Sequence, residues 1–159
     1  MNNLITDSKL IEKVLISSKT IAMVGVSSVK KKESPTLIKR RPSVIVMKYL
    51  QEYGYRVIPV NPTSEGKEIC GERAVSKLED ITIPIDIVNV FRPSQESLVI
   101  AKQAVKIGAK TLWLQYGIHN VEAQKIANSE NVNYIANRCI KQEYQKVFLK
   151  MSPVFPVLQ

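Results

Sequence analysis

Apolar residues alternate along the chain between short β-branched runs and longer segments with helical spacing. The short runs are nearly continuous in apolar residues, which is typical of strands buried on both faces of a sheet. They predict five strands, at 20–26, 55–60, 85–91, 111–115 and 132–136. The helical spacing predicts helices at about 7–18, 43–54, 94–107, 120–129 and 141–151. Residues 63–84 are expected to be mostly irregular, with one helical turn near 75–80.

Two helix starts carry capping signals. Asp7 is expected to cap the first helix, because an acceptor side chain at that place can bind a free backbone N–H group. Pro93-Ser94 is expected to cap the helix that follows strand 85–91. The apolar residues of that helix are Leu98, Val99, Ala101, Val105 and Ile107.

The order of these elements predicts a doubly wound α/β fold with a mostly parallel five-stranded sheet. We expect a single domain whose core spans about 20–145, preceded by the helix at 7–18. The helix at 141–151 and a loose tail containing Pro153 and Pro156 follow it. Ligands of such folds bind beyond the carboxyl ends of the strands, where the strand order switches. Candidate site residues are therefore those that directly follow each strand.

Composition narrows the class of protein. The chain has 159 residues, of which 45% are hydrophobic, and its formal net charge is +9. No apolar run is long enough for a membrane span, and no signal peptide is evident. Two cysteines without metal-ligand spacing favour a reduced cytoplasmic protein and predict no metal site. The positive charge indicates an anionic partner, whether nucleic acid, membrane surface or phosphorylated small molecule.

The turn after the first strand, in AMVGVSS, fits a phosphate group. Gly25 permits a tight turn, and Ser27 and Ser28 can add hydroxyl donors to free backbone amides. A plain tight turn with a capping serine would look the same. The second and third glycines of a dinucleotide fingerprint are missing, and Asn61-Pro62 stands where NAD-binding folds usually carry an acid. The pattern therefore indicates a nucleotide other than NAD.

A basic segment follows this turn. Between Ser27 and Ser43 six cations face one acid, Glu33; the cations are Lys30, Lys31, Lys32, Lys39, Arg40 and Arg41. The segment can be a solvated loop. Because it leaves the first strand end, its cations can also reach a ligand at the Gly25 turn, and a ligand with a pyrophosphate and a separate phosphate would use them.

Several segments together resemble the small stand-alone CoA-binding domain proteins, which are similar to the CoA-binding N-terminal domain of the succinyl-CoA synthetase α subunit. These segments are AMVGVSS, RPS-xxxx-KYLQEYGYRVIPVNP, DIVNVFRPSQE, IGAKTLWLQYGIHNVEA and NRCIKQEY, between Ile21 and Tyr144. The resemblance implies a Rossmann-like fold that holds coenzyme A along the carboxyl ends of the strands.

Carried over by position, the resemblance assigns parts of the ligand to parts of the chain. Gly25, Val26, Ser27 and Ser28 would meet the phosphates. The nucleotide would be lined by Asn61, Pro62, Val90, Phe91 and Arg92, and the pantetheine arm would pass Gln115 and Gly117. Arg41, Pro42 and Ser43 belong to the same expected site. The segment before them is longer and more basic than in the family, so which cation meets the 3′-phosphate stays open.

Residues that could perform chemistry are few. His119 is interpreted as a half-exposed loop residue without a relay partner, and Cys139 as a buried structural cysteine, with exchange with the CoA thiol as the alternative. We expect binding of CoA or an acyl-CoA by a carrier, sensor or accessory module without catalysis of its own. The alternatives are a basic nucleic-acid-binding domain or a dinucleotide-dependent oxidoreductase. Residues 27–43 lack the aromatics usual for RNA binding. No membrane partner is expected, and a protein partner stays open.

Overall fold

The computed structural model describes residues 7–27 and 42–150. The basic segment and the C-terminal tail lie outside these residues. The strands are β1 (Thr20–Val24), β2 (Arg56–Val60), β3 (Glu68–Ile69), β4 (Glu72–Arg73), β5 (Ile87–Val90), β6 (Thr111–Leu114) and β7 (Asn133–Ile135). The α-helices are α1 (Ser8–Ser17), α3 (Pro42–Glu52), α4 (Ser97–Lys106), α5 (Val121–Ser129) and α6 (Ile140–Tyr144). Short helical turns are η1 (Pro62–Ser64), η2 (Leu78–Asp80), η3 (Ser94–Glu96) and the π-helical η4 (Gln145–Leu149).

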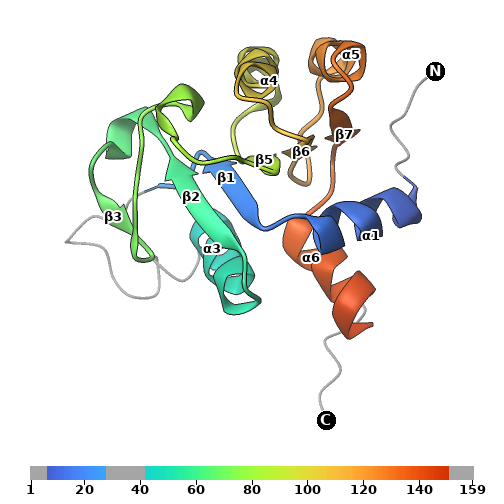
Figure 1. Cartoon of the computed structure of the whole chain (residues 1–159), viewed down its shortest axis with the longest axis horizontal. Coiled ribbons are helices and arrows are strands. Elements are labelled where there is room, and N and C mark those ends of the chain that lie inside the picture. The colour runs from blue at the N-terminus through green and yellow to red at the C-terminus, as the bar shows by residue number, and fades with distance from the viewer. Residues whose placement is uncertain (1–6, 28–41, 151–159) are drawn as a thin grey trace.

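Five strands form one sheet in the order β2-β1-β5-β6-β7, and each neighbouring pair is parallel. The chain first adds β2 on one side of β1 and then crosses to add β5 on the other side (Figure 1). The strand order therefore switches between β1 and β5, which is where doubly wound folds bind ligands. The predicted doubly wound α/β fold with a five-stranded parallel sheet is confirmed.

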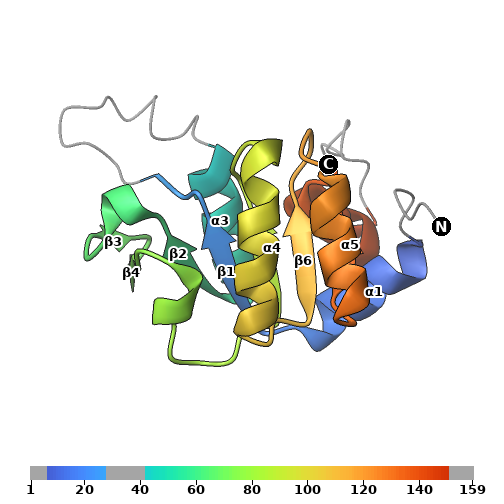
Figure 2. The same ribbon diagram turned by 90° about the horizontal axis from the view of Figure 1, so that it is seen from above.

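Helices cover both faces of the sheet. Helices α4 and α5 lie on one face, and α1, α3 and α6 lie on the other (Figures 1 and 2). Successive strand residues point to opposite faces, so side chains of each strand pack into both hydrophobic cores. In β1, Met23 packs with the α1, α3 and α6 side, whereas its neighbour Ala22 packs with the α4 and α5 side.

No helix within the described ranges has the length and apolar character that a membrane crossing requires.

Most predicted elements are present, with shorter strands. The Asp7 carboxylate accepts a hydrogen bond from the Lys9 N–H at 3.0 Å, so the predicted cap of α1 is confirmed. The small antiparallel β3–β4 hairpin was not predicted, and it interrupts the stretch expected to be irregular. The last helix is also different, because after Tyr144 it continues as a π-helix and ends before Lys150.

The predictions for α4 were partly wrong. Ser94 does not cap this helix; its hydroxyl accepts a hydrogen bond from the His119 N–H at 3.2 Å instead. Val99, expected on the apolar face, is 60% exposed. The buried apolar residues of α4 are instead Ile100, Ala101 and Ala104.

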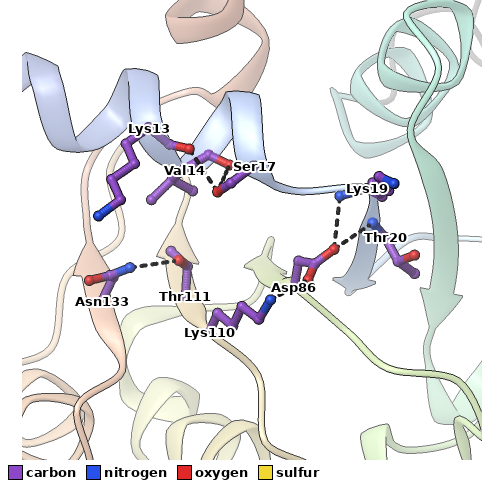
Figure 3. Close-up of polar contacts among 9 residues, drawn as sticks. All are labelled: Lys13, Val14, Ser17, Lys19, Thr20, Asp86, Lys110, Thr111 and Asn133. Atoms are coloured by element: carbon purple, nitrogen blue, oxygen red, sulfur yellow. Dashed lines mark hydrogen bonds and ion pairs between the residues drawn. The ribbon is translucent and has the colours of Figure 1, made fainter.

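A carboxylate ties the amino ends of β1 and β5 together (Figure 3). The Asp86 carboxylate accepts hydrogen bonds from the N–H groups of Lys19 at 2.8 Å and Thr20 at 3.1 Å, and the Lys110 ammonium lies 3.6 Å away. Burial alone would raise the pKa of Asp86, but the two N–H donors and Lys110 outweigh it and hold the pKa below its ordinary value. This contact lies at the opposite edge of the sheet from the predicted site, so its role is structural.

The outer edge of β2 is paired with the chain that follows the hairpin. Val60 forms a parallel bridge with Val75. The Val75 N–H donates to the Pro59 carbonyl at 3.0 Å, and the Asn61 N–H donates to the Val75 carbonyl at 2.9 Å. This pairing brings the segment around Val75 to the carboxyl end of β2.

Candidate functional site

A cleft of about 630 Å³ opens at the carboxyl ends of β1 and β2, against the first turns of α4. Its apolar floor includes the last residues of both strands, Val24 and Val60, and Ile100 of α4. The exposed Val99 also lines it, which explains why an apolar side chain of α4 turns away from the core. The predicted site residues that meet in this cleft are Gly25, Ser27, Asn61, Pro62 and Arg92.

Gly25 forms the turn between β1 and the cleft in a conformation that favours glycine. Its φ is +100°, and a Cβ atom there would lie 2.9 Å from Arg92 Cδ and 3.0 Å from the Phe91 carbonyl oxygen. The Gly25 N–H donates to the Val60 carbonyl at 2.8 Å, so the β1–β2 pairing occupies this amide. Gly25 therefore makes room for the stem of Arg92 rather than offering its own amide to a ligand.

Asn61 fixes the loop after β2. Its side-chain amide donates to the Val26 carbonyl at 3.0 Å, and its side-chain oxygen accepts from the Thr63 N–H at 3.1 Å and from the Thr63 hydroxyl at 2.9 Å. The residue is 9% exposed. Asn61 thus joins the turn after β1 to the loop after β2, and positions both walls of the cleft.

Arg92 brings a cation to the cleft and is paired with Glu96 one helical turn later. The Nε of Arg92 donates to Glu96 at 3.2 Å, and the Nη2 donates to the second carboxylate oxygen at 2.9 Å. Both side chains are half-exposed, at 45% and 44%. Both also line the cleft, so any anionic ligand there meets this ion pair.

Several cleft residues were missed by the sequence reasoning. They lie in the stretch expected to be irregular, in the turn η3 and on α4, and they are Ser76, Lys77, Gln95, Glu96 and Gln103. Lys77 is exposed, and among the described residues no carboxylate lies within ion-pairing distance of its ammonium. The β2–Val75 pairing brings Lys77 to the cleft. No local sequence pattern predicts that pairing.

Among the described residues, the others predicted from the turn after β1, the end of β5 and the start of α3 do not line the cleft. Val26 and Val90 are fully buried. Phe91 is half-buried and packs against the core on the α3 side. At the start of α3, Pro42 is exposed whereas Ser43 is 7% exposed. Ser28 and Arg41 lie outside the described residues.

The predicted pantetheine residues follow β6, two strands away from β1. The side-chain oxygen of Gln115 accepts from the Ile140 N–H at 2.9 Å and from the Asn89 amide at 3.4 Å, so this buried residue supports the start of α6. Gly117 is exposed, and its N–H donates to the Asn137 side chain at 2.7 Å. Gln115 therefore supports the carboxyl edge of the sheet from within the core, whereas Gly117 is exposed at that edge.

His119 and Cys139 also lie at the carboxyl edge. The His119 Nδ1 lies 2.9 Å from the Tyr134 hydroxyl, and this hydroxyl accepts a hydrogen bond from the Asn120 N–H at 3.0 Å. Burial raises the pKa of Tyr134, so its hydroxyl stays protonated at neutral pH. Cys139 is half-buried and packs against the core. Within the described part of the chain, no cluster of His, Cys, Asp and Glu could hold a metal ion.

The chain is similar to known proteins in sequence and in fold. A Bacillus subtilis (strain 168) protein, uncharacterized protein YneT, is 40% identical over 131 residues, which cover 82% of this chain and 89% of that protein. A Thermus thermophilus protein of known structure, cell-free ID.343, has 33% identity and a TM-score of 0.80, and the match covers 90% of this chain and 100% of that one.

A larger structure shares the fold alone. The dinucleotide-forming acetyl-coenzyme A synthetase 1 of Candidatus Korarchaeum cryptofilum has 22% identity and a TM-score of 0.61, and the match covers 79% of this chain and 27% of that one. Residues 19–145 match the CoA binding domain family. The resemblance seen in the sequence is thereby confirmed, and the chain belongs to the CoA binding domain family.

Proposed function

We propose that the protein binds coenzyme A or an acyl-CoA along the carboxyl edge of its sheet. One observation carries the proposal: a chain of the CoA binding domain family has a cleft of about 630 Å³ where β1 and β2 end, lined by Gly25, Ser27 and Arg92. Apolar strand ends at the floor suit a flat nucleotide base, and the cation at the rim suits a phosphate group.

The nucleotide end of CoA occupies this cleft, and the pantetheine arm runs across the edge towards Gly117. Neighbouring strands lie about 4.8 Å apart, so the path from β1 past β5 to β6 is about 10 Å. The phosphates meet Ser27 and Arg92, which lie where the nucleotide and pantetheine parts join. Lys77 provides a second cation for the separate 3′-phosphate.

The residue at the end of β2 supports CoA rather than NAD. An NAD-binding fold commonly has an acid there, whose carboxylate accepts hydrogen bonds from the ribose hydroxyls. Here the place is held by Asn61, whose amide and oxygen are engaged with Val26 and Thr63. Asn61 therefore has a structural task and brings no charge that would repel a ribose 3′-phosphate.

As to role, we propose a carrier, sensor or accessory module without catalysis of its own. Among the described residues, the hydrogen-bond partner of the His119 ring is the neutral Tyr134 hydroxyl, which cannot act as the carboxylate of a catalytic relay. Measured turnover of ATP, CoA and a carboxylic acid to acyl-CoA by the pure protein would contradict this part of the proposal.

Native mass spectrometry and thermal shifts test the binding. At a ligand concentration of about 100 times the Kd, CoA adds about 2.7 kcal/mol to the free energy of unfolding. For this chain length that is a rise of about 5–10 °C in Tm. Dephospho-CoA should give a smaller rise, and NAD little. Equal shifts with NAD and CoA would favour an oxidoreductase, whereas salt-sensitive RNA binding without a CoA shift would favour the nucleic-acid alternative.

A pair of charge variants locates the site. Ser27→Glu places a negative charge in the cleft and should abolish the CoA shift, because it repels the phosphates. Ser8→Glu adds the same charge at the exposed start of α1, far from the cleft, and should leave the CoA shift unchanged. Equal behaviour of the two variants would place the ligand elsewhere.

A further inference from the structure

The cleft proposed to receive a polyanion is lined by a carboxylate. We propose that Glu96 competes with the ligand for Arg92, so that Arg92 exchanges Glu96 for a ligand phosphate on binding and Glu96 sets the affinity of the site. This inference rests on the proposed function, because it concerns the same cleft.

Arg92 is placed for such an exchange. Its stem lies across Gly25, where Cγ and Cδ occupy the space that a side chain at residue 25 would need. Its Nε and Nη2 both face the Glu96 carboxylate, at 3.2 and 2.9 Å. A carboxylate and a phosphate offer similar oxygen pairs to this edge of a guanidinium group. A phosphate at the Gly25 turn therefore needs only a rotation of the Glu96 side chain, with the Arg92 stem left in place.

The strength of the ion pair allows the exchange. Both side chains are close to half-exposed, and solvent-exposed pairs of this kind contribute a factor of about two to five to an equilibrium constant. The phosphates of CoA carry more charge than one carboxylate and form the stronger contact. The pair is thus strong enough to hold Arg92 in the free protein and weak enough for CoA to replace it.

The charge of the cleft leads to the same inference. Its charged side chains among the described residues are Arg92, Lys77 and Glu96, so Glu96 cancels one of two cations. If Glu96 instead accepted a hydrogen bond from a ribose hydroxyl of the ligand, its loss would weaken binding. The two roles predict opposite signs for one substitution, and a measurement of affinity therefore distinguishes them.

Isothermal titration with CoA at constant salt tests the exchange. Glu96→Gln should bind CoA about two- to fivefold more tightly than the unsubstituted protein. Glu122→Gln is the matched control, because Glu122 forms a similar exposed ion pair with Lys125 on α5, outside the cleft. That control should leave the Kd unchanged. Weaker binding by Glu96→Gln, or an equal gain in both variants, would overturn the proposal.

A second background separates exchange from plain repulsion. Arg92→Met should weaken CoA binding, and adding Glu96→Gln to it should give no further gain, because no guanidinium is left to release. A gain of the same size in both backgrounds would mean that Glu96 only repels the ligand. Thermal midpoints in the absence of ligand verify that all variants fold.

If the unsubstituted protein binds no CoA, the proposed function fails together with this inference. If it binds CoA and Glu96→Gln gives no gain in affinity, only the inference fails.

Discussion

Replacement of Gly25 by alanine would place a methyl group against two neighbours at once. The φ of +100° costs a non-glycine residue about 1–2 kcal/mol. The new Cβ would lie 2.9 Å from Arg92 Cδ and 3.0 Å from the Phe91 carbonyl oxygen. The arginine stem can move, but the carbonyl belongs to the backbone that leaves β5, and such overpacking costs about 1–3 kcal/mol more. We expect Gly25→Ala to lower the free energy of unfolding by about 2–5 kcal/mol.

Gly54 provides the matched control for this substitution. Its φ of +97° is nearly the same, but nothing lies within 4 Å of a Cβ built there. Gly54→Ala should therefore cost only the backbone strain, about 1–2 kcal/mol. The difference between the two variants isolates the contact with Arg92 and Phe91.

Equilibrium unfolding in urea, monitored by circular dichroism, measures both values. In thermal unfolding followed by the same signal, the Tm should fall by about 4–20 °C for Gly25→Ala and by about 2–8 °C for Gly54→Ala. The folded Gly25→Ala protein should also lose CoA affinity, because the displaced Arg92 stem no longer positions its guanidinium group. Equal destabilisation by the two substitutions would refute the reasoning that Gly25 is required by a close approach of side chain and backbone.

Three further substitutions test other contacts. Because the pKa of Asp86 is lowered, the carboxylate stabilises the fold above its ordinary pKa near 4, and this contribution is lost as the pH falls below that value. In urea unfolding between pH 6 and 3, the free energy of unfolding should therefore decline less steeply for Asp86→Asn than for the unsubstituted protein, and an equal decline would contradict the assignment. Asn61→Ala leaves the Val26 carbonyl without its donor and should lower the Tm by about 4–12 °C, from a loss of about 2–3 kcal/mol; a shift below 2 °C would show that the loops do not depend on it. Burial raises the pKa of Tyr55 to about 12, so the stability contributed by the protonated hydroxyl is lost as the pH rises from 10 to 12. Tyr55→Phe should reduce this loss of free energy of unfolding, and absorbance at 295 nm follows the ionisation of the tyrosine.

The arrangement of the sheet could be predicted because the buried strands are strongly patterned. A segment such as IDIVNVF is apolar on both faces of the strand, and helical segments on either side require a parallel connection. The short β3–β4 hairpin could not be predicted in the same way, since its strands have two residues each and carry Glu68, Glu72 and Arg73. Its position depends on tertiary contacts rather than on a local pattern.

The candidate site was predictable where it directly follows a strand. Gly25, Asn61 and Arg92 were found by that rule. Lys77 and Glu96 were not, because neither directly follows a strand of the sheet: the pairing at Val75 brings Lys77 to the cleft, and Glu96 lies in the turn η3. The internal task of Asn61 was also hidden, since its hydrogen bonds join loops that lie 35 residues apart in the sequence.

The pairing of β2 with Val75 has a consequence for self-association. An outermost strand with free N–H and C=O groups is a template for strands of other chains, and such contacts lead to aggregation. Here the Pro59 carbonyl is already taken by the Val75 N–H, and Pro59 itself has no N–H to offer. The same short segment that builds one wall of the cleft thus covers the carboxyl-terminal part of the β2 edge against intermolecular strand addition. Substitutions around Val75 that loosen the cleft should therefore also make the protein more prone to aggregate.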